Sequence, residues 1–148
     1  MKVAVLMGSP NDKEKMKGAG EMLARFGIEV DERVMSAHRT PTQVAEFAGR
    51  ARDEGYAAVI CGAGMAAHLA GVVAAHTTLP VVGVPLSGGG LNGVDALYAT
   101  VQMPKGIPVA TVAIDGSANA GILVAEMLSI ADAGMAERLA EFRAGGAR

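Results

Sequence analysis

The chain has 148 residues, of which 51% are hydrophobic and only 3% aromatic, and its formal net charge is -2 at pH 7. This charge argues against binding to nucleic acid, as does the scarcity of aromatic rings on which unpaired bases could stack. No apolar run approaches about 18 to 20 residues free of Gly, Pro and charge, so no membrane span is expected; the lone Cys61 excludes an intrachain disulfide and favours the cytoplasm.

Short apolar runs that alternate with longer helical patterns predict a β–α repeat along the chain. The expected strands are Val3–Gly8, Ile28–Met35, Ala57–Gly62, Val81–Pro85 and Pro108–Ile114. The expected helices are Asn11–Phe26, Pro41–Glu54, Ala66–His76, Val94–Gln102 and Ala118–Asp132, then a short helix at Met135–Arg143 and a frayed end. We predict a single α/β domain over residues 1–148, a three-layer α/β/α sandwich whose five parallel strands have the flavodoxin-like order 2-1-3-4-5.

The first expected strand ends in Gly8-Ser9-Pro10-Asn11-Asp12, which has the features of a helix start. Ser9 suits the N-cap and Pro10 the first helical position. Free amide groups at a helix start also attract anions, so the segment is either a plain helix start or one that contacts a ligand as well. If the ligand is a phosphorylated sugar, Ser9 should meet the phosphate and Asp12 should accept hydrogen bonds from ribose hydroxyls.

The second expected strand leads into Ser36-Ala37-His38-Arg39-Thr40-Pro41. Thr40 as N-cap and Gln43 three residues later form a capping-box pattern, which places His38 and Arg39 at the carboxyl end of the strand. Ligands bind at that end in open α/β sheets. Histidine exchanges protons near neutral pH, and arginine is a permanent clamp for phosphate or carboxylate. The pair is therefore either an acid/base beside an anion clamp or two ordinary solvated loop residues.

The third expected strand ends at glycines, and His68 follows in the first turn of the next expected helix. Gly62 and Gly64 allow the backbone to approach a ligand closely, but the third glycine and the later acid of a dinucleotide site are missing. His68 is either a functional group or a satisfied structural histidine. His76, at the far end of the same helix, should point away from the ligand. The three separated histidines and one cysteine lack metal-ligand spacing, so no metal is expected.

The segment from Pro85 to Gly93 contains three consecutive glycines, Gly88–Gly90, which exclude a regular element there. It is either a mobile flap over the crevice or a plain flexible connection.

These segments together resemble one enzyme family. In order along the chain they are Gly8-Ser9-x-x-Asp12, Ser36-Ala37-His38-Arg39-Thr40-Pro41, Gly62-Ala63-Gly64-x-Ala66-Ala67-His68-Leu69, Gly93-Val94-Asp95-x-Leu97, Val101-Gln102-Met103-Pro104, Val109-Ala110-Thr111-Val112-Ala113-Ile114 and Asn119-Ala120. Over roughly residues 3–130 the chain is similar to the 5-(carboxyamino)imidazole ribonucleotide mutases of de novo purine synthesis. The resemblance implies an isomerase that moves a carboxylate from the exocyclic nitrogen of an aminoimidazole ribonucleotide to ring carbon 4, with no metal or other cofactor.

The resemblance also implies which residues act. His38 is the expected general acid and base, and His68 is the second expected catalytic residue. The expected substrate contacts are Ser9, Asn11, Asp12, Ser36, Arg39, Gly64, Ala66 and Leu69. The His-Arg-Thr-Pro form resembles the mutase branch, whereas related carboxylases that take carbon dioxide directly tend to have Lys after the His. Direct carboxylation of aminoimidazole ribonucleotide and a non-catalytic nucleotide-binding domain are the alternatives.

The chain departs from the family pattern at Asn11, where Ser is usual, at Ala70, where Pro is usual, and in the triple glycine. These differences bear on loop rigidity more than on chemistry. The resemblance further suggests a homo-octamer. Because the helix Ala118–Asp132 is apolar on more than one face, and because Leu139 and Phe142 form one stripe of the tail, we expect both segments at a subunit interface.

Overall fold

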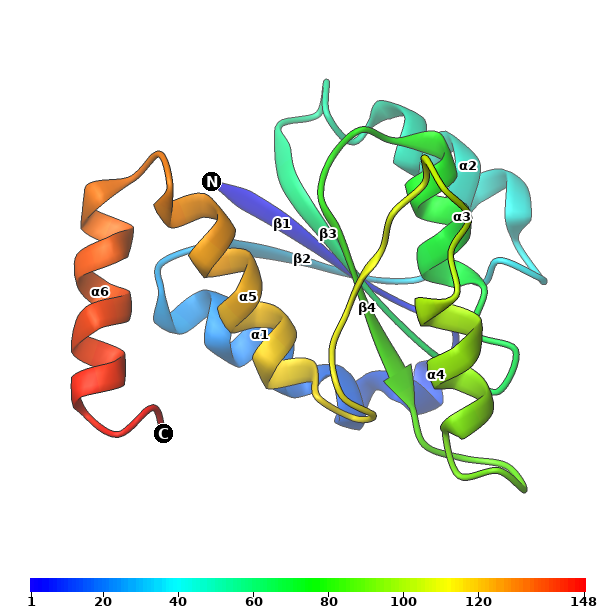
Figure 1. The fold of residues 1–148 in the computed structure, drawn as a ribbon. Coiled ribbons are helices and arrows are strands. Elements are labelled where there is room, and N and C mark those ends of the chain that lie inside the picture. The colour runs from blue at the N-terminus through cyan, green and yellow to red at the C-terminus, as the bar shows by residue number, and fades with distance from the viewer.

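The computed structural model describes residues 1–148 and has a single five-stranded parallel sheet with helices on both sides (Figure 1). The strands are β1 (Lys2–Met7), β2 (Glu29–Val34), β3 (Tyr56–Gly64), β4 (Val81–Leu86) and β5 (Ala110–Thr111). The helices are the 3-10 turn η1 (Pro10–Asp12), α1 (Lys13–Arg25), α2 (Pro41–Arg50), α3 (Leu69–His76), α4 (Val94–Val101), α5 (Ser117–Ser129) and α6 (Ala133–Ala144). The strand order β2-β1-β3-β4-β5 confirms the predicted flavodoxin-like α/β fold.

Alternate side chains of the strands fill two separate apolar layers. In β1, Val3 and Val5 face the layer covered by α1 and α5, whereas Ala4 and Leu6 face the layer covered by α2 and α3. All four side chains are fully buried. With both faces covered, the exposed functional groups gather at the edge where the parallel strands end.

The strand β5 and the helix α2 are shorter than the sequence predicts. β5 pairs with β4 only through Ala110 and Thr111. Pro108, at the predicted strand start, has no N–H to donate, and beyond the strand only isolated bonds continue, from Val112 N to Gly83 O and from Asp115 N to Pro85 O. The helix α2 ends at Arg50, and the chain turns through residues 51–55 before β3 begins.

The C-terminal helix α6 packs on its own chain. Its stripe of Met135, Leu139 and Phe142 is buried in the same cluster as Leu23 of α1 and Phe26, the residue that follows this helix. The end of α1 and the facing side of α5 therefore cover this stripe within the chain, and a subunit interface at the tail stays a prediction. On α5, which lies beside α1 and α6 (Figure 1), Ala120, Val124 and Ala125 are buried in this cluster. Other apolar side chains of the helix are only partly buried against it, namely Ile122, Leu123, Met127 and Leu128, so the interface expected at this helix also stays a prediction.

No helix combines the length and the apolar character that crossing a bilayer requires. Cys61, in β3, is free and buried, and burial raises the pKa of its thiol.

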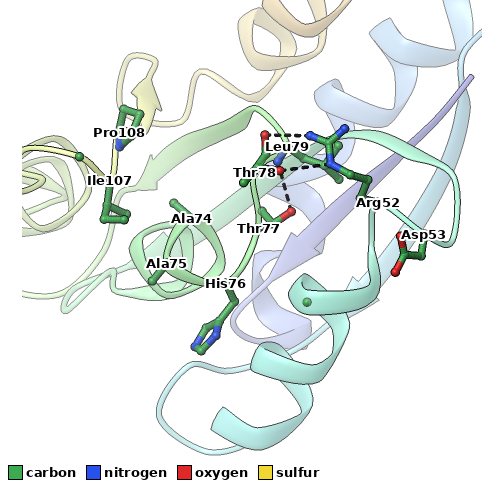
Figure 2. A pocket seen from close by; sticks show the side chains of 12 residues that line it. Arg52, Asp53, Ala74, Ala75, His76, Thr77, Thr78, Leu79, Ile107 and Pro108 are labelled. Atoms are coloured by element: carbon green, nitrogen blue, oxygen red, sulfur yellow. Dashed lines mark hydrogen bonds between the residues drawn. The ribbon is translucent and has the colours of Figure 1, made fainter.

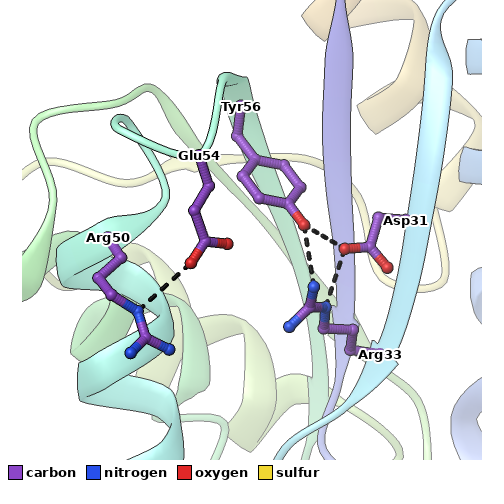
Figure 3. A network of polar contacts seen from close by, with 5 residues as sticks. All are labelled: Asp31, Arg33, Arg50, Glu54 and Tyr56. Atoms are coloured by element: carbon purple, nitrogen blue, oxygen red, sulfur yellow. Dashed lines mark hydrogen bonds and ion pairs between the residues drawn. The ribbon is translucent and has the colours of Figure 1, made fainter.

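A polar network joins β2 to the start of β3 (Figure 3). Tyr56 donates a hydrogen bond to Asp31 Oδ2, which also accepts from Arg33 Nε at 2.8 Å. Arg33 in turn donates to the Tyr56 hydroxyl oxygen at 3.1 Å. Burial raises the pKa of Asp31, but the hydrogen bonds from Tyr56 and Arg33 and the charge of Arg33 outweigh it and hold the pKa below its ordinary value of 3.8.

This network predicts an acid-dependent stability difference. The pKa of Asp31 is lower in the folded chain than in the unfolded one. The ionised side chain therefore stabilises the fold at pH values above its ordinary pKa, and this contribution is lost as the pH falls through the pKa of the folded state. We expect Asp31→Asn to lower the free energy of unfolding at neutral pH, by an amount that shrinks in acid. Urea unfolding across this pH range measures the difference, with the exposed Asp53→Asn as control. A difference that stays constant into acid would contradict the assignment.

Candidate active site

A cavity of about 610 Å³ opens at the carboxyl edge of the sheet, where β1, β2, β3 and β4 end. All ten residues that the sequence predicts for the site line it, namely Ser9, Asn11, Asp12, Ser36, His38, Arg39, Gly64, Ala66, His68 and Leu69. They come from three loops that are far apart in the sequence. The structure therefore brings every predicted site residue to one place, and their roles toward a substrate stay predictions.

The turn that carries His38 and Arg39 is held by two hydroxyl side chains. Ser36 Oγ accepts hydrogen bonds from the backbone N–H groups of His38, at 3.3 Å, and Arg39, at 3.1 Å. Thr40 Oγ1 accepts from Ser36 N at 3.0 Å and donates to Ser36 O at 3.2 Å. Thr40 is the N-cap of α2, as predicted, but its side chain makes no capping bond, so the predicted capping box with Gln43 is wrong. The hydroxyl instead fixes the turn in front of the helix.

The two predicted catalytic histidines are hydrogen-bonded to each other. His38 Nε2 lies 2.7 Å from His68 Nδ1, and the rings meet edge to face with centroids 4.8 Å apart. One of the two nitrogens must donate and the other accept, so a single proton lies between the rings. If both facing nitrogens carried a proton, neither could accept, and the hydrogen bond would be lost. The arrangement is suited to passing one proton at a time to and from a ligand in the cavity.

His68 occupies a different position from the predicted one. It is the N-cap of α3 rather than a residue of its first turn, because the loop before it is irregular. Met65 has a positive φ of 53°, and tight turns follow, in which Ala67 N bonds to Met65 O and His68 N to Ala66 O. The loop places the imidazole of His68 opposite that of His38.

The first loop supplies Ser9 and Asp12. Ser9 caps η1 as predicted, with its Oγ accepting from Asn11 N at 3.2 Å. Burial raises the pKa of the Asp12 carboxyl, and the hydrogen bond from the Ser9 backbone and the charge of Lys15 only partly offset this. Hydroxyl donors on a ligand would stabilise this carboxylate, because hydrogen bonds to the charged form of an acid favour that form.

Arg39 provides the cation of the cavity. It lines the wall beside His38 and takes part in none of the ion pairs of the chain. An exposed guanidinium with no carboxylate partner remains free to bind a phosphate or carboxylate of a ligand with two parallel hydrogen bonds.

Further lining residues were not identified from the sequence as site residues. Ala37 and Ala63 are backbone neighbours of predicted residues, and Met65 is 59% exposed at the mouth. Ser87 and Gly88 belong to the glycine-rich segment, whose loop character was predicted. The sequence signal that could have found them is the position of this segment directly after β4, at the same edge of the sheet.

A second cavity, of about 570 Å³, lies at the opposite edge, between the ends of α2 and α3 and the loop before β5 (Figure 2). His76 lies here, which confirms that it is remote from His38 and His68. The cation of this cavity, Arg52, is already engaged, since it donates to Thr78 Oγ1 at 3.2 Å and to Thr78 O at 3.0 Å. Nowhere in the chain do three His, Cys, Asp or Glu side chains gather into a possible metal site.

The chain is similar to known proteins over nearly its whole length. The AIR carboxylase family model matches residues 2–148. The N5-carboxyaminoimidazole ribonucleotide mutase of Vibrio vulnificus is 51% identical over 97% of this chain and 90% of its own length, and that of Thermotoga maritima is 48% identical over 96% and 83%. A chloroplastic phosphoribosylaminoimidazole carboxylase of Vigna aconitifolia is 46% identical over 93% of this chain but 25% of its own length.

The fold of the chain also matches a solved structure. The crystal structure of Treponema denticola PurE superposes with a TM-score of 0.87 at 28% identity, over 99% of this chain and 91% of that one. With a family match that spans nearly every residue and relatives at about half identity, the chain belongs to the AIR carboxylase family.

Proposed function

We propose that this protein is an N5-carboxyaminoimidazole ribonucleotide mutase, an isomerase of de novo purine synthesis. The observation that carries the proposal is the hydrogen-bonded pair His38 and His68 beside the unpaired Arg39 in one cavity. The similarity to proteins named as this mutase supports it. The reaction moves a carboxylate from the exocyclic nitrogen of the substrate to ring carbon 4.

The proposed chemistry needs one proton that is given and then recovered. His38 donates a proton to the exocyclic nitrogen as the N–C bond breaks and carbon dioxide leaves. Ring carbon 4 then attacks the carbon dioxide, forming the new C–C bond, and His38 removes the proton from carbon 4 to restore aromaticity. The hydrogen bond between His38 and His68 holds the His38 ring in place for both transfers. Holding the carbon dioxide next to carbon 4 replaces an encounter in solution with a reaction inside one complex.

The substrate's polar groups have matching partners. We assign the phosphate to Arg39, with Ser9, Asn11 and the nearby amide groups, and the ribose hydroxyls to Asp12. Gly64, Ala66 and Leu69 form the wall beside the histidines. At Gly64 an added Cβ would lie 3.3 Å from Leu86 O, so a side chain there would crowd β4 and narrow the cavity.

A turnover assay tests the proposal. Purified protein given N5-carboxyaminoimidazole ribonucleotide should form the carbon-4 carboxylate without added bicarbonate. Direct carboxylation of aminoimidazole ribonucleotide is the second candidate, favoured by the name of the Vigna relative. Product formation only from aminoimidazole ribonucleotide, and only with bicarbonate, would establish that second function. No turnover with either substrate would leave a binding domain.

We expect Arg39→Ala to weaken binding of the ribonucleotide by about 2 to 4 kcal/mol, because charge-assisted hydrogen bonds to the phosphate are lost. Titration calorimetry measures the change. Arg50→Ala is the control, since Arg50 pairs with Glu54 on the exposed surface of α2 and should leave binding unchanged. If the nucleoside that lacks the phosphate bound the unaltered protein as tightly as the nucleotide, Arg39 would not be the phosphate clamp.

We also propose that the protein works as a homo-oligomer, an octamer as the resemblance suggests, in the cytoplasm. Exposed apolar side chains on α4 and in the loop before it support association, namely Val94, Tyr98 and Val101 of the helix and Leu91 of the loop, with Tyr98 61% exposed. The single buried thiol suits a reducing compartment. Light scattering measures the assembly, and a monodisperse 15.0 kDa particle at micromolar concentration would contradict it.

A further inference from the structure

The loop after β4 forms part of the wall of the catalytic cavity and is built from flexible residues. Ser87 and Gly88 line the cavity, and two more glycines follow. Gly88 and Gly89 have φ values of 150° and 60°, and Leu91 beyond them is 63% exposed. Such a backbone has little intrinsic preference for one conformation. Something outside the loop must therefore fix it if the wall is to keep one shape.

Three charge-assisted hydrogen bonds hold the first residue of this loop. Lys15 of α1 reaches across from its helix, and its Nζ donates to Ser87 O at 2.5 Å and to Ser87 Oγ at 2.9 Å. Ser87 N donates to Asp115 Oδ1 at 2.9 Å. Every polar group of Ser87 thus has a partner on a charged side chain, and bonds of this kind are stronger than neutral ones.

The segments that carry Lys15 and Asp115 are also linked to each other by a hydrogen bond. Ser117, two residues after Asp115, donates from its Oγ to Lys15 O at 2.6 Å, so α1, the loop and the start of α5 form a closed ring of contacts. Burial raises the pKa of Asp115, but hydrogen bonds from Ser87 and the charge of Lys15 outweigh it and lower the pKa below its ordinary value. Asp115 is therefore ionised at neutral pH.

The other end of the loop returns to the same point. At Gly93, whose φ is 94°, an added Cβ would lie 3.0 Å from Ser87 Cα and 2.8 Å from Ile114 Cγ2. Residues 88–92 consequently form a lobe that is closed at its base. The lobe reaches the mouth of the cavity, because a Cβ at Gly89 would lie 3.3 Å from Met65 Cγ. Fixing Ser87 therefore fixes the position of the lobe against the loop that carries His68.

We propose that Lys15 is a positioning residue for the reaction, which holds this lobe closed over the cavity and so retains carbon dioxide between its release and its recapture. The inference rests on the proposed function. When the lobe opens too early, the N–C bond has broken and the nitrogen has taken its proton from His38, but no C–C bond forms. Carbon dioxide then escapes, aminoimidazole ribonucleotide leaves as a side product, and His38 regains its proton from solvent.

Two measurements on Lys15→Met test the inference. This change keeps an unbranched side chain, one atom shorter, but removes its charge and donors. Lys17→Met is the matched control, since Lys17 is on the same helix and makes only an exposed pair with Glu21. In the first measurement, hydrogen exchange of the backbone amides of residues 87–93 should become about tenfold faster in Lys15→Met and stay unchanged in Lys17→Met.

The second measurement is the ratio of aminoimidazole ribonucleotide released to carbon-4 carboxylate formed. We expect this ratio to rise about threefold or more in Lys15→Met, to stay unchanged in Lys17→Met, and to be partly restored in Lys15→Arg. Unchanged exchange in a folded Lys15→Met would overturn the role of Lys15 in holding the loop. Faster exchange with an unchanged ratio would overturn its role in retention. If the unaltered protein did not convert the substrate at all, the proposed function itself would be wrong. The exchange measurement does not depend on turnover, so it tests the hold of Lys15 on the loop separately.

Discussion

His38→Asn should abolish turnover while the protein still binds the ribonucleotide within about tenfold of the unaltered affinity. Asparagine is polar and can still form hydrogen bonds, but it cannot give and recover a proton. Loss of a positioned general acid and base typically lowers a rate by about 10²- to 10⁴-fold. In the proposed reaction the loss should lie at the upper end, because both the release and the recapture of carbon dioxide depend on this one side chain.

The measurement is the rate of formation of the carbon-4 carboxylate, with binding measured separately by calorimetry. His76→Asn is the matched control, since it makes the same substitution at a histidine in the cavity at the opposite edge of the sheet (Figure 2). That variant should keep full activity. Retention of more than about a few per cent of the rate in His38→Asn would eliminate His38 as the acid and base.

The parts of the site that depend on local sequence could be predicted. Ser9 caps its turn, and Thr40 precedes Pro41 at the start of α2, because these features need only neighbouring residues. The alternation of strands and helices then brought the loops together, since parallel strands end at one edge. The joint role of His38 and His68 came only from the resemblance to a known family, and their direct hydrogen bond was not predicted.

The parts that depend on tertiary contacts could not be predicted. Lys15 lies in an ordinary helical pattern, and only the fold shows that its amine meets Ser87, 72 residues later. The Thr40 hydroxyl appeared to be a helix cap from its spacing, but it bonds to Ser36 because the turn before the helix folds back on itself. The tail appeared to need a neighbouring subunit because its stripe is apolar, and sequence does not show that α5 and the end of α1 offer a matching surface in the same chain.

The packing of that tail gives the largest expected effect on stability. Phe142 of α6 is only 6% exposed and meets Phe26 edge to face, with ring centroids 5.5 Å apart. The guanidinium of Arg25 lies over the same ring, 4.7 Å from its centre. Phe142→Ala removes this contact and leaves a cavity beside Phe26, so we expect the free energy of unfolding to fall by about 3 to 5 kcal/mol.

Urea unfolding at neutral pH measures this loss, and Glu141→Ala, one position earlier on the exposed side of α6, should change the stability by less than about 0.5 kcal/mol. Because the contact lies within one chain, the loss in Phe142→Ala should be independent of protein concentration. A loss that appeared only on dilution would instead place Phe142 between subunits and restore the interface that the sequence suggested. Removal of residues 133–148 should cost still more, since Met135 and Leu139 leave the same cluster together with Phe142.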